Sequence, residues 1–181
     1  MNPDLYCSDP SLNDPEAQVP VDYELTYSDV FERMNLSQEF ARRHEIGIVP
    51  GETMFSGCVT FAIRNERGVK VGYYGLSIPD VQPVYDCSLQ PQLYLYNYHT
   101  IDPTQSVIFT NSLLNWILFA TSDYFKHNQI IAAFGQSTLS ARQWRLLRCL
   151  AAVAFMGPYD EIQSLINQAE KYLYTPVTEP D

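Results

Sequence analysis

Apolar residues in the first half of the chain follow the pattern of a β-hairpin. Residues 57–64 (GCVTFAIR) and 69–76 (VKVGYYGL) are strand-like runs, joined by the turn Asn-Glu-Arg-Gly at 65–68. Gly68 stands where such a turn favours a positive φ angle, so we predict an antiparallel hairpin. Two short helical segments are predicted ahead of the hairpin, at residues 28–34 and at residues 38–44 with Ser37 as N-cap.

The pattern changes after residue 105, where short apolar runs alternate with amphipathic segments. Buried strands are predicted at residues 106–110 and 129–134, each followed by a helical segment. The run 151–156 is either a third strand or the end of the preceding helix. Alternation of strands and helices predicts a parallel sheet covered on both faces. The predicted helices cover residues 113–125, the segment opened by a capping box at 140–143, and residues 160–173.

These elements divide the chain into four parts. Residues 1–27 are rich in Pro, Asp, Asn and Ser and are expected to form an acidic, irregular arm. Residues 28–105 are expected to form an α+β N-terminal lobe. This lobe is joined to an α/β lobe with a mainly parallel sheet, residues 106–174, and residues 175–181 are expected to form a flexible tail.

The net charge of −10 is concentrated near the N-terminus. Residues 1–30 contain seven acidic and no basic residues, and such a segment repels phosphate groups. The charge therefore argues against tight nucleic-acid binding by the whole chain, whereas a small basic patch on the balanced remainder stays open. We expect the arm to keep the protein soluble, with docking to a partner as the alternative.

Composition limits the class of protein further. With 46% hydrophobic residues the chain is too apolar to be disordered, yet its apolar runs are too short to span a membrane. The N-terminus lacks the basic start and apolar stretch of a secretory signal. The four cysteines are far apart and fit neither a zinc ribbon nor a disulfide scaffold. We expect a cytoplasmic protein with free thiols and no membrane contact.

Several segments, taken in order, resemble motifs of bacterial replicative DNA primases. Residues 35–47 (NLSQEFARRHEIG) resemble the "GLSxExIxRFxIG" approach to the catalytic core, and residues 61–75 resemble the "FPIRDxxGxVxGFGG" hairpin. Residues 107–115 (VIFTNSLLN) are similar to "VIVVEGYxD", the start of a Toprim fold. Residues 134–143 resemble "LGTALTxxQ", and 155–157 fall near the "FDGD" turn. The resemblance implies a primase-like N-terminal lobe and a Toprim-like α/β lobe.

The same resemblance implies a metal site whose carboxylates are missing. A Toprim site uses a Glu after its first strand and a D-x-D pair after a later strand, which holds Mg²⁺. This chain has Asn111 in place of the Glu and Met156 and Pro158 in place of the Asp pair. Asn115 replaces a further Asp. We therefore expect no catalytic residue and no cofactor, with Mg²⁺ only if the protein is active after all. Asp160 and Glu161 are weak candidate metal ligands.

A few residues are candidates for nucleic-acid binding. Arg64 matches an arginine of the primase hairpin, and three alternating tyrosines offer one aromatic face that could stack unpaired bases. Two arginines at helical spacing could contact phosphates. Packing against a neighbouring element is the favoured alternative for the tyrosines, and a solvated helix face is the favoured alternative for the arginines. These residues are Tyr94, Tyr96 and Tyr98, and Arg142 and Arg145, with Arg148 on the same stripe.

We therefore expect a non-catalytic relative of the primase core, encoded with a bacterial DNA replication or mobile-element system. It would bind a protein partner, such as a component of the replication machinery, or bind nucleic acid weakly. Two alternatives stay open. One is an active primase-like nucleotidyl-transfer protein, and the other is a weak single-strand binder that uses the tyrosine face.

Overall fold

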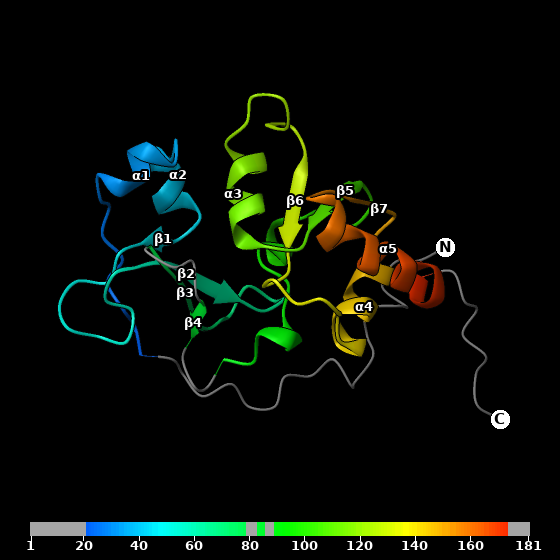
Figure 1. The fold of residues 1–181 in the computed structure, drawn as a ribbon, viewed down its shortest axis with the longest axis horizontal. Coiled ribbons are helices and arrows are strands. Elements are labelled where there is room, and N and C mark those ends of the chain that lie inside the picture. Colours follow the sequence, from blue (N-terminus) through cyan, green and yellow to red (C-terminus); the bar gives the residue numbers. More distant parts are fainter. Residues whose placement is uncertain (1–20, 79–82, 86–88, 174–181) are drawn as a thin grey trace. The chain divides into compact units, whose positions relative to one another are not determined.

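The computed structural model describes residues 21–78, 83–85 and 89–173, and these form two compact units (Figure 1). We call them the antiparallel unit and the parallel unit after their sheets, and each is described by itself. The described antiparallel unit comprises residues 21–78, 83–85 and 89–90 together with Asn97–Thr100, and the described parallel unit comprises Pro91–Tyr96 and residues 101–173. Most of the predicted arm and the predicted tail lie outside the described residues.

The antiparallel unit is built on the predicted hairpin. Strands β2 (Cys58–Arg64) and β3 (Lys70–Ser77) pair with Phe61 opposite Tyr74. Gly68 has a φ angle of 77°, which confirms the turn, and the Asn65 side chain accepts hydrogen bonds from the backbone N–H groups of Arg67 and Val69. Two short strands, β1 (Ile46–Gly47) and β4 (Pro83–Tyr85), complete a sheet in the order β1-β2-β3-β4.

Short helices and large apolar side chains complete this unit. Helix α2 (Gln38–Arg43) begins as predicted, because the Ser37 hydroxyl accepts a hydrogen bond from the Phe40 N–H. Helix α1 (Val30–Arg33) is shorter than the predicted segment. The unit's core holds rings that are fully buried, and apolar burial of this size is its main source of stability. The largest of these side chains are Phe31, Phe55, Phe61 and Tyr73.

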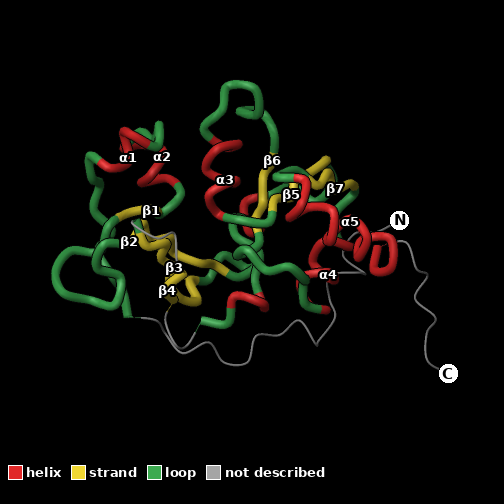
Figure 2. The backbone as a smooth tube through the Cα atoms, in the orientation of Figure 1, coloured by secondary structure: helices red, strands yellow, loops and turns green. Residues whose placement is uncertain are grey.

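The parallel unit has a three-stranded sheet in the order β6-β5-β7 (Figure 2). Strand β5 (Ser106–Thr110) lies in the centre, and β6 (Gln129–Ala132) and β7 (Ala152–Phe155) pair with it in parallel. The run 151–156 is therefore a strand and not a helix end. Residues 107–110 are all buried, so both faces of β5 are covered. The prediction of full coverage is wrong at β7, where Ala152 and Ala154 are exposed.

The three helices of this unit differ in how well their patterns predict them. Helix α4 (Ala141–Arg148) has the predicted capping box, and α5 (Tyr159–Leu173) has nearly the predicted bounds. Helix α3 (Leu113–Ala120) ends earlier than the predicted residue 125. Its buried side holds Leu113, Trp116 and Ile117, and Trp116 donates its indole N–H to the Ile130 carbonyl, whereas Leu118 is 62% exposed.

The chain passes between the units earlier than the predicted boundary at residue 105. Tyr96 and Ala132 exchange backbone hydrogen bonds of 2.8 and 3.2 Å, which attaches Pro91–Tyr96 to the edge of β6. Residues 97–100, which include the short 3-10 helix η4 (Tyr98–Thr100), return to the antiparallel unit before β5 begins. Among the described residues, no helix is long and apolar enough to cross a membrane.

Candidate functional site

Two of the predicted metal-site positions meet at the carboxyl end of the parallel sheet. Phe109 of β5 pairs with Phe155 of β7, and the N–H of Met156 donates to the Phe109 carbonyl over 2.9 Å. Asn111 and Met156 therefore follow the ends of neighbouring strands. In parallel α/β sheets this edge is where ligands commonly bind, because the loops after the strands converge there.

Amide groups occupy this edge. Asn111 is only 4% exposed, and its side-chain oxygen has no hydrogen-bond partner among the described residues. Asn115 lies in the first turn of α3, where its backbone N–H is capped by Ser112. Its side-chain amide donates to the Glu161 carboxylate over 3.4 Å. Of the two weak candidate ligands, Asp160 and Glu161, Glu161 is the one that the described residues show hydrogen-bonded at this edge.

The side chains at this edge do not fit a resident Mg²⁺ ion. Mg²⁺ requires near-octahedral oxygen ligands, with carboxylates to offset the cost of removing its water. Asn111 and Asn115 supply neutral oxygens, Met156 supplies a thioether, and Pro158 has no side-chain donor. The buried, unpartnered oxygen of Asn111 carries no negative charge. Within the described part of the chain, no three His, Cys, Asp or Glu side chains form a metal-binding group.

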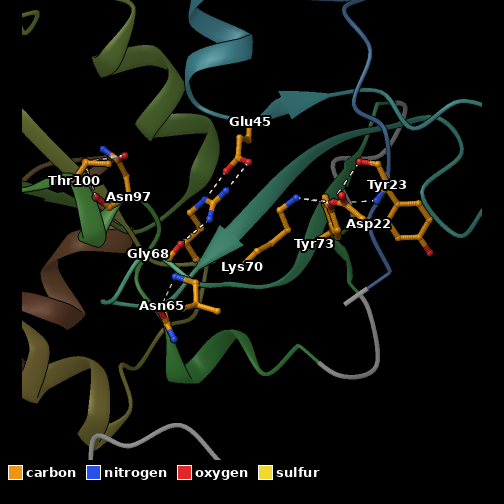
Figure 3. Close-up of polar contacts among 11 residues, drawn as sticks. Asp22, Tyr23, Glu45, Asn65, Gly68, Lys70, Tyr73, Asn97 and Thr100 are labelled. Atoms are coloured by element: carbon orange, nitrogen blue, oxygen red, sulfur yellow. Dashed lines mark hydrogen bonds and ion pairs between the residues drawn. The ribbon is translucent and has the colours of Figure 1, made fainter. Parts of the chain in front are cut away.

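Arg64 is engaged in a structural ion pair within the antiparallel unit. Its guanidinium donates to both carboxylate oxygens of Glu45 over 2.6 and 2.8 Å and to the Gly68 carbonyl over 2.6 Å (Figure 3). Hydrogen bonding to Arg64 lowers the pKa of Glu45, and the same bonds raise the pKa of Arg64. Three of the five guanidinium N–H groups are thus committed, which limits the contacts that Arg64 could make to a phosphate.

The same unit contains a second cluster of hydrogen-bonded polar side chains, which the sequence pattern did not predict. Lys70 donates to Asp22 over 2.7 Å and to the Tyr73 hydroxyl over 3.1 Å, and that hydroxyl donates to Asp22 over 3.0 Å (Figure 3). The hydrogen bond from Lys70 lowers the pKa of Asp22. Because Asp22 is 48 residues from Lys70, no local spacing signals this contact.

The tyrosine face does not exist as an exposed surface. The short 3-10 helix η3 (Pro91–Leu93) precedes the three alternating tyrosines. Tyr94 and Tyr96 are 6% and 4% exposed, and the Tyr96 ring packs edge-on against Trp116 at 4.8 Å between centroids. Tyr98 begins η4 and belongs to the other unit. The burial of these two rings agrees with the packing interpretation, and neither ring offers an exposed face on which a base could stack.

The arginine stripe on α4 is not a uniformly solvated face. Arg142 is 6% exposed and lies over the Tyr94 ring, 5.9 Å from its centroid. Arg145 is half-buried and only Arg148 is exposed. The three arginines follow helical spacing, but the buried surface of α4 is wider than its apolar residues alone indicate, because Arg142 and Gln143 are also buried. Arg142 therefore serves a packed interior contact of the parallel unit.

Comparison with known proteins shows which fold the chain resembles. No family model and no curated protein matches the sequence. Three solved structures are similar: the DnaG primase catalytic domain bound to single-stranded DNA (16% identity, TM-score 0.62), the Aquifex aeolicus primase zinc-binding and RNA polymerase domains (13%, 0.66), and the primase fragment of the bacteriophage T7 primase-helicase (11%, 0.60). They match 77%, 80% and 93% of this chain.

The chain spans 58% of the length of the DnaG catalytic domain and 46% of the Aquifex aeolicus primase domains, so it matches only part of each. It spans 72% of the T7 fragment. At such low identity the likeness concerns architecture alone. An antiparallel sheet followed by a parallel three-stranded sheet with helices agrees with the α+β and α/β lobes predicted from the sequence. The chain therefore has a primase-like fold, with a Toprim-like parallel unit.

Proposed function

We propose that this protein is a non-catalytic relative of the primase core, which acts in DNA replication or in a mobile element by binding a protein partner. Weak binding to nucleic acid is a secondary property. The observation that carries the proposal is the carboxyl edge of the parallel sheet, where Asn111 and Asn115 stand at positions that resemble the acidic residues of the primases.

The chemistry of this edge supports the proposal. Phosphoryl transfer depends on positioning and on cations that neutralise developing charge, and Mg²⁺ cannot be held by two amides and a thioether with the required affinity. One similar structure holds single-stranded DNA, but Arg64 here is bound to Glu45 and Tyr94 and Tyr96 are buried. These features favour a protein partner over nucleic acid.

Two measurements on the purified protein test the proposal. Isothermal titration with Mg²⁺ and Mn²⁺ should give no binding at millimolar concentration, and template-directed synthesis of oligoribonucleotides should be absent with either ion. Synthesis that is lost in a Glu161→Gln variant would overturn the proposal in favour of an active enzyme that uses α5 acids. Affinity purification of the tagged protein from its own cells, with Asn115→Arg as the matched variant, should retain a partner that the variant loses.

A further inference from the structure

One edge of the parallel sheet is open. Strand β7 lies on the side of β5 away from β6 (Figure 2), and among the described residues no strand pairs with its outer side. The opposite edge of the sheet differs, because Tyr96 exchanges backbone hydrogen bonds with Ala132 of β6. Within the described part of the chain, the sheet is therefore covered at β6 and uncovered at β7.

The backbone of β7 directs hydrogen-bonding groups toward this open edge. The N–H of Met156 donates to the Phe109 carbonyl, and in a parallel pair every second residue directs its backbone groups toward the neighbouring strand. The N–H and C=O groups of Val153 and Phe155 consequently point away from β5, and no described residue accepts from or donates to them. Exposed backbone groups of this kind are a template for pairing with another strand.

The sequence of β7 lacks the features that usually prevent such pairing. Natural edge strands are protected by lysine, proline or a bulge. Residues 149–157 (CLAAVAFMG) contain no charged residue and no proline, and the pairing with β5 has no shift in register. The Phe155 ring packs on Phe109 on one face of the sheet, whereas Ala152 and Ala154 are exposed on the other. These small side chains allow a second strand to approach closely.

The charges beside β7 favour one orientation of that second strand. Arg148 precedes the uncharged run, Asp160 and Glu161 follow it, and all three side chains are exposed. When two copies of a strand pair in antiparallel orientation, the beginning of each lies beside the end of the other. The positive end of one copy then meets the negative end of its partner, while a parallel pair would bring like charges together. The charge pattern is thus complementary to itself in the antiparallel arrangement, which a twofold axis produces.

We propose that β7 pairs in antiparallel orientation with β7 of a second copy of this chain, around a twofold axis at Ala154. Val153 of each copy then lies opposite the partner's Phe155, and the two residues exchange the hydrogen bonds that their backbone groups lack in one copy. The sheets of the two copies join into one continuous sheet. This self-association does not rest on the proposed function, because it uses the side of the sheet and not its carboxyl end.

Disulfide cross-linking of the full chain tests the register. Ala154→Cys should form a covalent dimer under mild oxidation, because opposite residues of this pair are about 4.5 Å apart at Cα, within the range of a disulfide. Ala152→Cys is the matched control on the same exposed face. Its two copies would be offset by roughly 13 Å along the strands, which no disulfide spans. Non-reducing electrophoresis measures the dimer, with the unaltered chain as the background for Cys58 and Cys149.

Analytical ultracentrifugation tests the association itself. The chain should dimerise with a dissociation constant of about 10–100 µM, as is usual for a small interface. Ala154→Lys should raise this constant at least about tenfold, because it places two ammonium groups at the axis. Asn128→Lys adds the same charge at an exposed position outside β7 and should leave it unchanged. A thermal melt of each variant checks that the fold is intact.

The orientation has its own test, because a charge reversal can be compensated. Arg148→Glu should weaken the dimer, and adding Asp160→Arg to the same chain should restore it, since opposite charges again meet across the axis. Loss of the dimer through a local structural change would not be restored in this way. If the second substitution weakens the dimer further, the antiparallel arrangement is wrong.

Other results would also overturn the proposal. These are a monomer at concentrations up to ~1 mM, equal cross-linking of the two cysteine variants, and equal effects of the two lysine variants. A monomer whose Val153 and Phe155 amides are protected from hydrogen exchange would assign the edge to a segment of the same chain. A different protein that is retained from cells and lost with Ala154→Lys, without a dimer, would assign it to that protein. None of these measurements depends on whether the carboxyl end of the sheet binds metal.

Discussion

Glu45 has a left-handed backbone conformation, with a φ angle of 51°, although its side chain carries a Cβ. Such a conformation is costly for residues other than glycine and asparagine, and surrounding contacts must hold it. Two contacts do so here. The Glu45 carbonyl accepts from the Ala62 N–H over 3.0 Å, and its carboxylate is bound by Arg64. The ion pair therefore fixes the connection between α2 and β1 to the central hairpin.

Replacing Arg64 by lysine should destabilise the protein by about 1–2 kcal/mol, because lysine cannot reproduce the bidentate bond to Glu45 and the bond to Gly68. The expected loss of stability is this small because both side chains are about 30% exposed and water screens the ion pair. Urea unfolding followed by circular dichroism measures it. Asp123→Asn is the control, since its pair with Lys126 is fully solvated and should contribute no measurable stability. Equal effects in the two variants would contradict a bracing role for Arg64.

The lowered pKa of His44 predicts that the protein loses stability in acid. Burial, assisted by Arg43 and His99, lowers the pKa of His44 to about 4. The unfolded chain keeps the ordinary value near 6.5, so it takes up a proton that the folded protein resists. The free energy of unfolding should therefore fall as the pH decreases from about 6.5 to about 4. Burial also lowers the pKa of His99, which adds to the effect.

The measurement is urea unfolding at several pH values for the wild type and for His44→Phe, which keeps a ring against Phe40 (4.4 Å between centroids). The variant should lose less stability between pH 6.5 and pH 4.5, a window set by the pKa values above. If both proteins have the same slope over this range, His44 does not titrate as its burial implies.

Residue types alone did not reveal these roles. Arg64 matches a hairpin arginine of the primases, and the sequence could not identify Glu45, 19 residues away, as its partner. The same holds for Asp22 and Lys70. Their side chains are the kind that usually lie in solvent, and only the fold brings them together. Burial of the Tyr94 and Tyr96 rings was the favoured alternative, because aromatic side chains more often pack than remain exposed.

At the scale of elements, helix starts are the most predictable features, since they depend on neighbouring residues. Ser140→Ala should cost about 1–2 kcal/mol, because the Ser140 hydroxyl accepts from the Gln143 N–H and also donates to the Gln92 carbonyl over 2.5 Å. Thermal unfolding measures the loss. Ser137→Ala is the control, because Ser137 is exposed and precedes the helix. If the Ser140 variant were as stable as the control, the capping box would not stabilise α4.

Element boundaries could be predicted where local chemistry sets them and not elsewhere. Strand β5 has the predicted bounds because its run is buried on both sides, and α4 begins at its capping box. Helix α3 ends at Ala120, short of the predicted Phe125, because the polar residues Thr121, Ser122 and Asp123 follow it. On its apolar side Leu113 and Ile117 are buried, but Leu114 and Leu118 are exposed, and Trp116 packs inward with a bond to the Ile130 carbonyl.

At the scale of the whole chain, the order of the elements was predictable and the places where the chain changes unit were not. Strand–helix alternation correctly indicated the parallel sheet. The return of Asn97–Thr100 to the antiparallel unit depends on contacts between distant residues, such as the approach of His99 to Gly68. The candidate metal positions were placed by resemblance, and the pairing of β5 with β7 brings Asn111 and Met156 to one edge.

This placement leads to a gain-of-function prediction. If the edge lacks only its carboxylates, the triple variant Asn111→Glu, Met156→Asp, Pro158→Asp should bind Mn²⁺ with a dissociation constant of about 1 mM or tighter, since oxygen ligands would then converge beside Glu161. Electron paramagnetic resonance of free Mn²⁺ measures the binding. A charge-matched variant with three acids at exposed positions, Asn128→Asp, Ser137→Asp and Thr138→Asp, should leave Mn²⁺ free. Equal binding by the two variants would mean that added charge alone attracts the ion. In that case the Toprim-like fold would have lost the geometry of its metal site as well as the carboxylates.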